Sequence, residues 1–66
     1  MTILEGQTLI IGLMKSWGID KETAMITAFL ETEEQILNMM TWMRSLNNIP
    51  SVLQIKEKVM QIIKES

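Results

Sequence analysis

The chain contains no cysteine and no histidine among its 66 residues. Without cysteine, no disulfide can stabilise the fold, and this composition fits a reducing compartment. Without histidine, the chain lacks the commonest protein ligand for transition metals and the commonest general base near neutral pH. Serine, threonine, lysine and acidic residues are present, but no spacing places a nucleophile beside a base and a third, orienting group. We therefore expect a protein that is not an enzyme and that binds no metal, cofactor or small-molecule substrate.

Long apolar runs and an excess of positive charge are also missing. The longest apolar run, residues 9–14, is far shorter than the roughly 20 residues that a membrane-spanning helix needs. Glu5 stands where a secretory signal peptide carries positive charge. The expectation is a cytoplasmic protein without membrane contact, encoded from Met1 as a complete short reading frame. The formal net charge of −2 gives nucleic acid no electrostatic reason to bind.

What the sequence does contain is enough apolar residues, 47% of the chain, for one hydrophobic core. Four segments open with residues that cap a helix start by accepting hydrogen bonds from its free amides, namely Thr2-x-x-Glu5, Asp20, Thr32-x-x-Gln35 and Ser51-x-x-Gln54. Gly18 suits the left-handed end of the first helix, and Pro50 disfavours helix at the residue before it. The sequence predicts an all-α single domain over residues 1–66, a compact bundle of four short helices at about 3–16, 21–30, 33–46 and 51–65.

The helix expected at residues 3–16 is apolar over a broad arc. Its central stripe consists of Ile3, Ile10, Met14 and Trp17, with Leu13 beside it. The stripe is widened on one side by Leu4 and Ile11 and on the other by Leu9. One partner helix cannot cover so wide an arc. Gly6 and Gly12 weaken this helix by roughly 1 kcal/mol each relative to alanine. They either fray its start or let another backbone approach closely. A strand over residues 8–14 is the alternative, but no second strand is available to pair with it.

The other three helices show narrower apolar stripes. In the third, a seam with spacings of three and four residues consists of Ile36, Met39, Met40, Met43 and Leu46. Leu37 and Trp42 lie on opposite flanks of this seam and need other cover. The second helix is expected to bury Met25, Ala28 and Phe29. The fourth is expected to bury Val52, Ile55, Val59, Ile62 and Ile63, with Leu53 and Met60 to one side.

Met39, Met40 and Met43 have two interpretations. Unbranched, polarizable side chains line adaptable grooves for partner helices in some proteins. Methionines at helical spacing also fill gaps in a core. A core this small needs most of its apolar residues inside, which favours the second interpretation.

The apolar residues exceed what a monomer of this size usually covers. The sequence therefore predicts a small non-catalytic protein–protein interaction module that self-associates as a homo-oligomer through apolar helix faces. The candidate contact residues lie outside the central stripes or are tryptophans, a residue type enriched at binding hot spots. They are Trp42, Leu37, Trp17, Leu53 and Met60.

A DNA-associated regulator is the alternative function. The helices expected at 21–30 and 33–46 are joined closely, as in a helix-turn-helix. The outward side of the second of them carries Asn38, Thr41, Arg44 and Ser45. Phosphate contacts dominate DNA affinity, and this helix offers a single cation for them. We therefore expect no nucleic acid among the partners.

Charge is distributed unevenly along the chain. Residues 1–34 carry six acids and two lysines, a net charge of −4, whereas residues 35–66 carry four bases and two acids, a net charge of +2. The two halves either pair, within one molecule or head-to-tail between molecules, or are solvated surfaces whose exposed pairs contribute about 0–1 kcal/mol. Glu31, Glu33 and Glu34 stand at a helix start, where negative charge is favoured without any ligand.

Several motifs carry a resemblance to known helical proteins. They are Gly18-Ile19-Asp20-Lys21-Glu22, Leu30-x-Thr32-Glu33-Glu34-Gln35, Met39-x-x-Trp42-Met43 and Asn48-x-Pro50-Ser51. Over about residues 18–63 this order resembles short uncharacterised all-helical proteins of Gram-positive bacteria and their phages or mobile elements. The motifs are mostly capping and core residues, so the resemblance implies a fold and no function.

A fainter likeness is to the ubiquitin-associated helical domain. Trp17-Gly18-Ile19 and Trp42-Met43 match the two places that form the partner-binding patch of that family. Here the junction between the second and third helices is shorter and lacks the usual glycine, and a fourth helix is expected. The likeness implies a helical shape, and shape alone is weak evidence for function.

Overall fold

The computed structural model describes residues 2–65, and every regular element within that range is helical. The elements are α1 (Ile3–Ser16), α2 (Lys21–Ala24), the 3₁₀-helix η1 (Met25–Phe29), α3 (Glu33–Ser45) and α4 (Val52–Glu65). The predicted all-α bundle of four short helices is confirmed, with α2 and η1 together forming the second. The Cα radius of gyration is 10.7 Å, close to the about 11 Å expected of a folded chain of this length.

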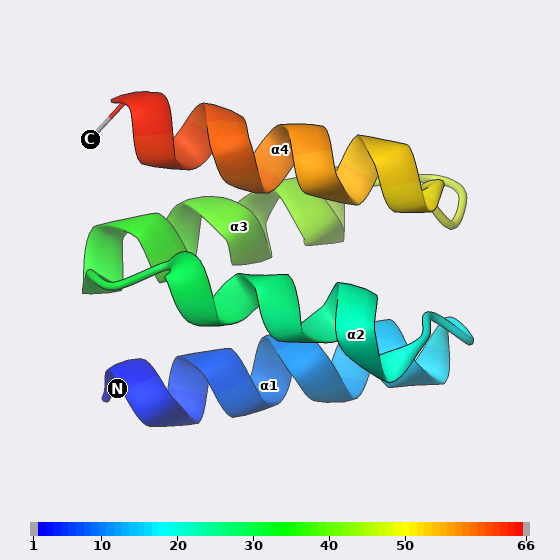
Figure 1. Cartoon of the computed structure of the whole chain (residues 1–66), viewed down its shortest axis with the longest axis horizontal. Helices are drawn as coiled ribbons and strands as arrows, with labels where there is room; N and C mark the ends of the chain where they lie inside the picture. Colours follow the sequence, from blue (N-terminus) through cyan, green and yellow to red (C-terminus); the bar gives the residue numbers. More distant parts are fainter. Residues whose placement is uncertain (1, 66) are drawn as a thin grey trace.

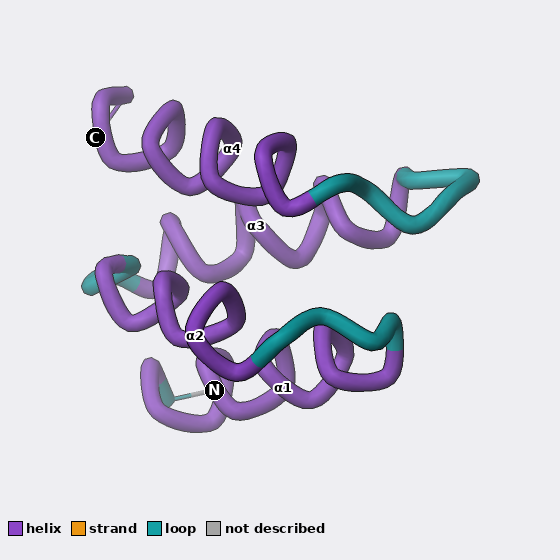
Figure 2. The backbone as a smooth tube through the Cα atoms, turned by 45° about the vertical axis from the view of Figure 1, so that its right-hand side comes forward, coloured by secondary structure: helices purple, strands orange, loops and turns teal. Residues whose placement is uncertain are grey.

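The helices pack around a square, and their spatial order differs from their order in the chain (Figure 1). α1 packs against α2, η1 and α3, whereas α4 packs against η1 and α3. α1 and α4 therefore occupy opposite corners. α1 and α3 run in one direction and α2 and α4 in the other, with the loops at the two ends of the bundle (Figure 2). This order leaves α1 and α3 side by side and parallel, which positions the site described below.

The predicted capping box at the start of α3 is confirmed. The Thr32 hydroxyl accepts a hydrogen bond from the Gln35 amide at 3.1 Å. In return, Oε1 of Gln35 accepts from the amides of Glu31 at 2.8 Å and Thr32 at 3.2 Å. The buried Gln35 side chain thus satisfies both amides of the short connection, and it fixes where η1 ends and α3 begins.

The cap of α4 follows its sequence signal, and that of α1 does so in part. Ser51 and Gln54 cap α4 reciprocally, at 3.2 Å for the Gln54 amide and 2.8 Å for the Ser51 amide. At α1, the Thr2 hydroxyl accepts from the Glu5 amide at 3.1 Å and donates to the Glu5 carboxylate at 3.0 Å. Thr2, Ser51 and Gln54 each accept from an amide that the helix itself leaves free. The Glu5 carboxylate accepts from the Thr2 hydroxyl instead of the Thr2 amide, so the predicted reciprocal capping box is incomplete at α1.

The turn from α1 to α2 depends on Gly18. Its φ of +81° is in the left-handed region, as predicted for the end of this helix. The Gly18 amide donates to the Lys15 carbonyl at 3.0 Å, and the Ile19 amide donates to the Met14 carbonyl at 3.1 Å. These two bonds form a Schellman motif, which closes α1 and redirects the chain.

Asp20 caps α2, as its sequence position predicts. Its carboxylate accepts from the Thr23 hydroxyl at 2.6 Å and from the Thr23 amide at 3.0 Å. These two bonds hold the pKa of Asp20 below its usual value, and the positive charge of Lys56 contributes a smaller effect in the same direction.

The core lies where the four helical segments meet, and α3 supplies its centre. Ile36, Met39 and Met43 are buried, while Met40 and Leu46 at the edges of the same seam are half-buried. Met39 and Met43 therefore fill the core, as the second interpretation of the methionines requires. The buried hydrophobic residues are Ile10, Met14, Ala24, Leu30, Ile36, Met39, Met43, Ile55, Val59 and Ile62.

The predicted inward face of the second helix is wrong. Met25, Ala28 and Phe29 are exposed, Phe29 by 67%. The buried residues are instead Thr23, Ala24, Thr27 and Leu30. From Met25 onward the chain winds as a 3₁₀-helix with three residues per turn. Positions 24, 27 and 30 therefore align, whereas the prediction assumed a continuous α-helix.

Three further residues expected in the core are more exposed than predicted. Val52 and Ile63 retain 38% and 39% of their accessible surface. They lie at the edge of the inward stripe of α4, whose centre includes Ile55 and Ile62. Ile3, in the first turn of α1, is exposed as well. The bundle covers the middle of each apolar stripe and leaves its margins to solvent.

The two glycines of α1 have different surroundings. Gly6 is buried within a helix that is continuous from Ile3, so it does not fray the helix start. Gly12 faces outward, and a Cβ built on it meets no heavy atom within 4 Å. No other segment of the described chain therefore approaches α1 closely at Gly12.

Candidate interaction surface between α1 and α3

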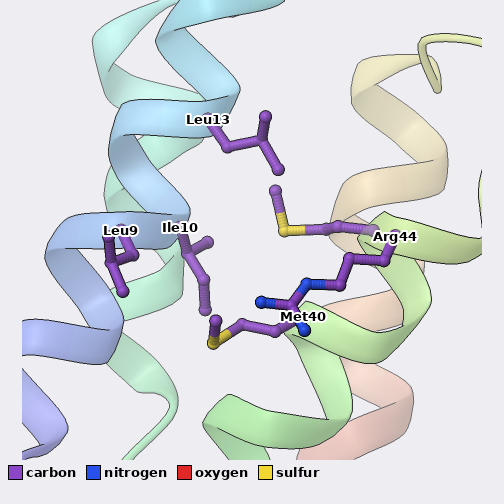
Figure 3. Close-up of a pocket in the computed structure, with 6 residues that line it drawn as sticks. Leu9, Ile10, Leu13, Met40 and Arg44 are labelled. Carbon is purple, nitrogen blue, oxygen red and sulfur yellow. The ribbon is translucent and has the colours of Figure 1, made fainter. Parts of the chain in front are cut away.

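The seam between α1 and α3 opens into an apolar pocket of about 180 Å³. Its lining residues are Leu9, Ile10, Leu13, Met40, Met43 and Arg44. Figure 3 shows Ile10 and Leu13 projecting from α1 toward α3, while the Arg44 side chain extends from α3 toward α1. Leu9 lies beside Ile10 on α1. An engineered cavity of about 150 Å³ in another protein holds benzene. This pocket is therefore large enough to receive one apolar side chain of another molecule.

Leu37 extends the apolar surface along α3. It precedes Met40 by three residues and Arg44 by seven, so all three lie on the same flank of the helix. Leu37 is 47% exposed and Leu9, across the seam, is 57% exposed. We use the name α1–α3 face for the surface formed by Leu9, Leu13, Leu37, Met40 and Arg44.

The exposed leucines of α1 follow from its broad apolar arc. The buried positions of this helix are Gly6, Ile10 and Met14. Leu9 and Leu13 each precede a buried residue by one position, so they lie on one margin of the buried stripe. That margin meets α3, which covers it incompletely. The prediction that one partner helix cannot cover this arc is confirmed.

The row of residues on this flank of α3 has opposite charges at its two ends. Glu33 precedes Leu37 by four residues, and Arg44 follows Met40 by four. Both charged side chains are exposed, and within residues 2–65 neither forms a hydrogen bond or an ion pair. The apolar middle of the row thus has an unpaired negative charge at one end and an unpaired positive charge at the other.

Trp42 lies elsewhere. It follows Leu37 by five residues, which turns it by about 140° around the helix. It is half-buried, packs against the core, and lines a hollow between α3 and α4 with Gln54 and Lys58. The prediction that Leu37 and Trp42 occupy opposite flanks is confirmed, so these two candidates do not share one contact surface.

The remaining candidates are also dispersed. Leu53 and Met60 are exposed on α4, and the hollow beside Met60 is lined by the charged Glu57 and Lys64. Trp17 is half-buried at the end of α1 and packs against the core. The predicted contact residues therefore include one residue of the α1–α3 face, Leu37. They do not include its neighbours there, Leu9, Leu13 and Met40.

Two hydroxyl groups on the polar side of α3 form hydrogen bonds within the helix. The Thr41 hydroxyl donates to the Leu37 carbonyl at 2.9 Å, and the Ser45 hydroxyl donates to the Trp42 carbonyl at 2.7 Å. Arg44 is the only lysine or arginine of this helix. Its side chain extends toward α1 and lines the apolar pocket.

Two negative findings apply to the part of the chain that the structure describes. Residues 2–65 contain no group of three cysteine, histidine or acidic residues arranged to hold a metal ion. None of the helices described in that range has both the length and the apolar character needed to cross a membrane.

No family model, no curated protein and no solved structure matches this chain. Inference about its function therefore starts from the geometry of its own surface, in which the α1–α3 face is the most coherent feature.

Proposed function

We propose that this protein is a small interaction module that self-associates by apolar contact through its α1–α3 face. The observation that carries this proposal is the gathering of Leu9, Leu13 and Met40 around one open pocket, with the exposed Leu37 one turn from Met40 on the same flank of α3. These side chains come from two parallel helices and form a continuous surface rather than scattered single residues. Contiguous exposed apolar patches of this kind mark protein contact sites.

The exposed face is not the result of an open or incomplete fold. The described chain has an accessible surface of 4495 Å², close to the about 4,300 Å² expected of a folded monomer of this mass. The ten core hydrophobics are at most 4% exposed. The bundle is closed, and most of the exposed apolar residues lie on its helices.

The α1–α3 face is favoured over α4 as the contact surface. On α4, the exposed Met60 is flanked by charged Glu57 and Lys64, which a partner would have to desolvate. The lining of the α1–α3 pocket includes one charged residue, Arg44, whose side chain reaches from α3 toward α1. Burying its apolar area stabilises a complex by about 25 cal/mol per Å² before the entropic cost of association.

The proposal predicts different effects for two chemically identical substitutions. Leu37→Glu places a charge inside the contact surface and is expected to weaken self-association by at least about tenfold. Leu53→Glu makes the same change on α4 and is the matched control, expected to alter self-association by less than about twofold. Both leucines are exposed, so neither substitution disturbs the core. Light scattering over a concentration series measures the average mass of each variant.

The average mass of the wild-type protein is expected to rise with concentration. The average mass of Leu37→Glu is expected to stay constant over the same range. A wild-type protein that stays monomeric at high micromolar concentration would overturn the proposal. A loss of association in Leu53→Glu alone would transfer the contact to α4.

A further inference from the structure

Four residues on one flank of α3 form a row that is symmetric in position and complementary in charge. Glu33, Leu37, Met40 and Arg44 follow one another at spacings of four, three and four residues. They therefore share one side of the helix. An acid begins the row, two apolar residues form its middle, and a base ends it. The outer pair, Glu33 and Arg44, and the inner pair, Leu37 and Met40, are both centred between residues 38 and 39.

A row with this symmetry is complementary to an antiparallel copy of itself. Glu33 then meets Arg44 of the partner subunit at both ends, and Leu37 meets Met40 of the partner subunit in the middle. We propose that two copies of this chain associate in this way, about a twofold axis that passes between Leu37 and Met40. The inference rests on the proposed function and specifies its partner, a second copy, and its register. A twofold contact uses the same surface of both copies and closes at the dimer.

The pocket beside this row provides the space that such packing needs. Met40 and Arg44 of the row line the pocket, together with Leu9 and Leu13 of α1. In the antiparallel register, Leu37 of the partner subunit lies over Met40 and fits into this pocket of about 180 Å³. The arrangement is that of a knob entering a hole on the facing helix.

Charge selects the antiparallel direction over the parallel one. A parallel pair would place Glu33 beside its own copy and Arg44 beside its own copy, and such like-charge contacts are unfavourable. The antiparallel pair converts both into attractions. Neither side chain has an ion-pair or hydrogen-bond partner within residues 2–65, so pairing across the interface disrupts no described interaction.

The size of the molecule limits the area of the contact. The described chain measures 25 × 22 × 22 Å, so one side of it offers roughly 500 Å² per partner, at the lower end of the sizes of specific interfaces. The dimer is therefore expected to dissociate in the micromolar range.

The test must separate this pairing from the dipole of α3. An acid at the start and a base at the end of a helix also suit the dipole of the helix itself. The stability of a single variant therefore does not distinguish the two explanations. A mixture of two charge-reversed variants does, because the dipole acts within one chain and the proposed pairing acts between chains.

The variants are Glu33→Arg, which has arginine at both ends of the row, and Arg44→Glu, which has glutamate at both ends. Each alone places like charges at both ends of the antiparallel pair, and its dimer is expected to be about tenfold weaker than wild type. A one-to-one mixture restores opposite charges at both ends. The dissociation constant of the mixed dimer is expected to lie within about threefold of the wild-type value. At about 0.5 M salt, the mixture is expected to associate no more strongly than the separate variants. Sedimentation equilibrium measures each sample, and circular dichroism verifies that each variant is helical.

The matched controls are two charge reversals on α4, Glu57→Arg and Lys64→Glu. Their mixture is expected to contain the average of the dimer fractions of the two separate variants. Should either α3 variant fail to fold, Glu33→Gln and Arg44→Gln are measured instead. Each of these is expected to raise the dissociation constant of the dimer about threefold. If the α3 mixture shows no more dimer than its separate components while Leu37→Glu still prevents association, the register is wrong and the proposed function stands. A wild-type chain that remains monomeric overturns both.

Discussion

Ile36→Ala is expected to lower the free energy of unfolding by about 2–5 kcal/mol. Ile36 has no accessible surface and lies in the central seam of α3, surrounded by the other core residues. Truncation to alanine removes buried methyl and methylene groups and leaves a cavity that a four-segment bundle cannot easily collapse. Urea unfolding followed by circular dichroism, at a protein concentration low enough to avoid self-association, measures the change.

A loss of this size takes most of the stability that a single core of about 70 residues or fewer supplies. Leu53→Ala is the control, because Leu53 is 64% exposed and its truncation is expected to cost less than about 0.5 kcal/mol. A loss below about 1 kcal/mol for Ile36→Ala would mean that this side chain is not part of a packed core.

Gln35→Ala is expected to destabilise the fold by about 1–3 kcal/mol, because it leaves two partly buried donors without their acceptor. The Gln35 side chain accepts from the amides of Glu31 and Thr32, which form the connection between η1 and α3. Water reaches this site poorly, since Gln35 is buried. The same urea experiment measures the effect.

Gln54→Ala is the matched control for this substitution. Gln54 accepts a similar bond, from the Ser51 amide at 2.8 Å, but it does so at the exposed start of α4. Water can replace the lost acceptor there, so the expected loss is about 0.5 kcal/mol. Equal losses at the two positions would show that burial of Gln35 adds nothing to the strength of its cap.

The caps could be predicted from the sequence because they depend on residues three positions apart. Thr32 with Gln35 and Ser51 with Gln54 find each other within one helical turn, whatever the rest of the chain does. Gly18 is similar, since its left-handed conformation is a local need of the turn. The number and positions of the helices followed from these signals.

The face of the second helix could not be predicted in this way. Whether residues 25–29 wind as an α-helix or a 3₁₀-helix is decided by packing against α1 and α4, which the local sequence does not specify. The change from 3.6 to three residues per turn turned Met25 and Phe29 outward and placed Thr27 in the core.

The candidate site was predictable only in part, for a similar reason. Helical spacing alone showed that Leu37 lies off the central seam of α3 and that Leu9 widens the stripe of α1. Spacing within single helices does not reveal which margin of α1 meets which margin of α3. That contact depends on α1 and α3 being neighbours in the bundle, and it brought Leu9 and Leu13 to the flank that carries Met40.

The central claim is that the chain self-associates through the α1–α3 face, and methyl NMR spectra over a dilution series test it most directly. The predicted result is that the methyl resonances of Leu9, Leu13, Leu37 and Met40 shift together with concentration, because these groups enter and leave the contact. Those of Leu53 and Met60, on α4, are predicted to stay in place. Shifts confined to the α4 methyl groups, or spectra that do not change up to high micromolar concentration, would contradict the claim.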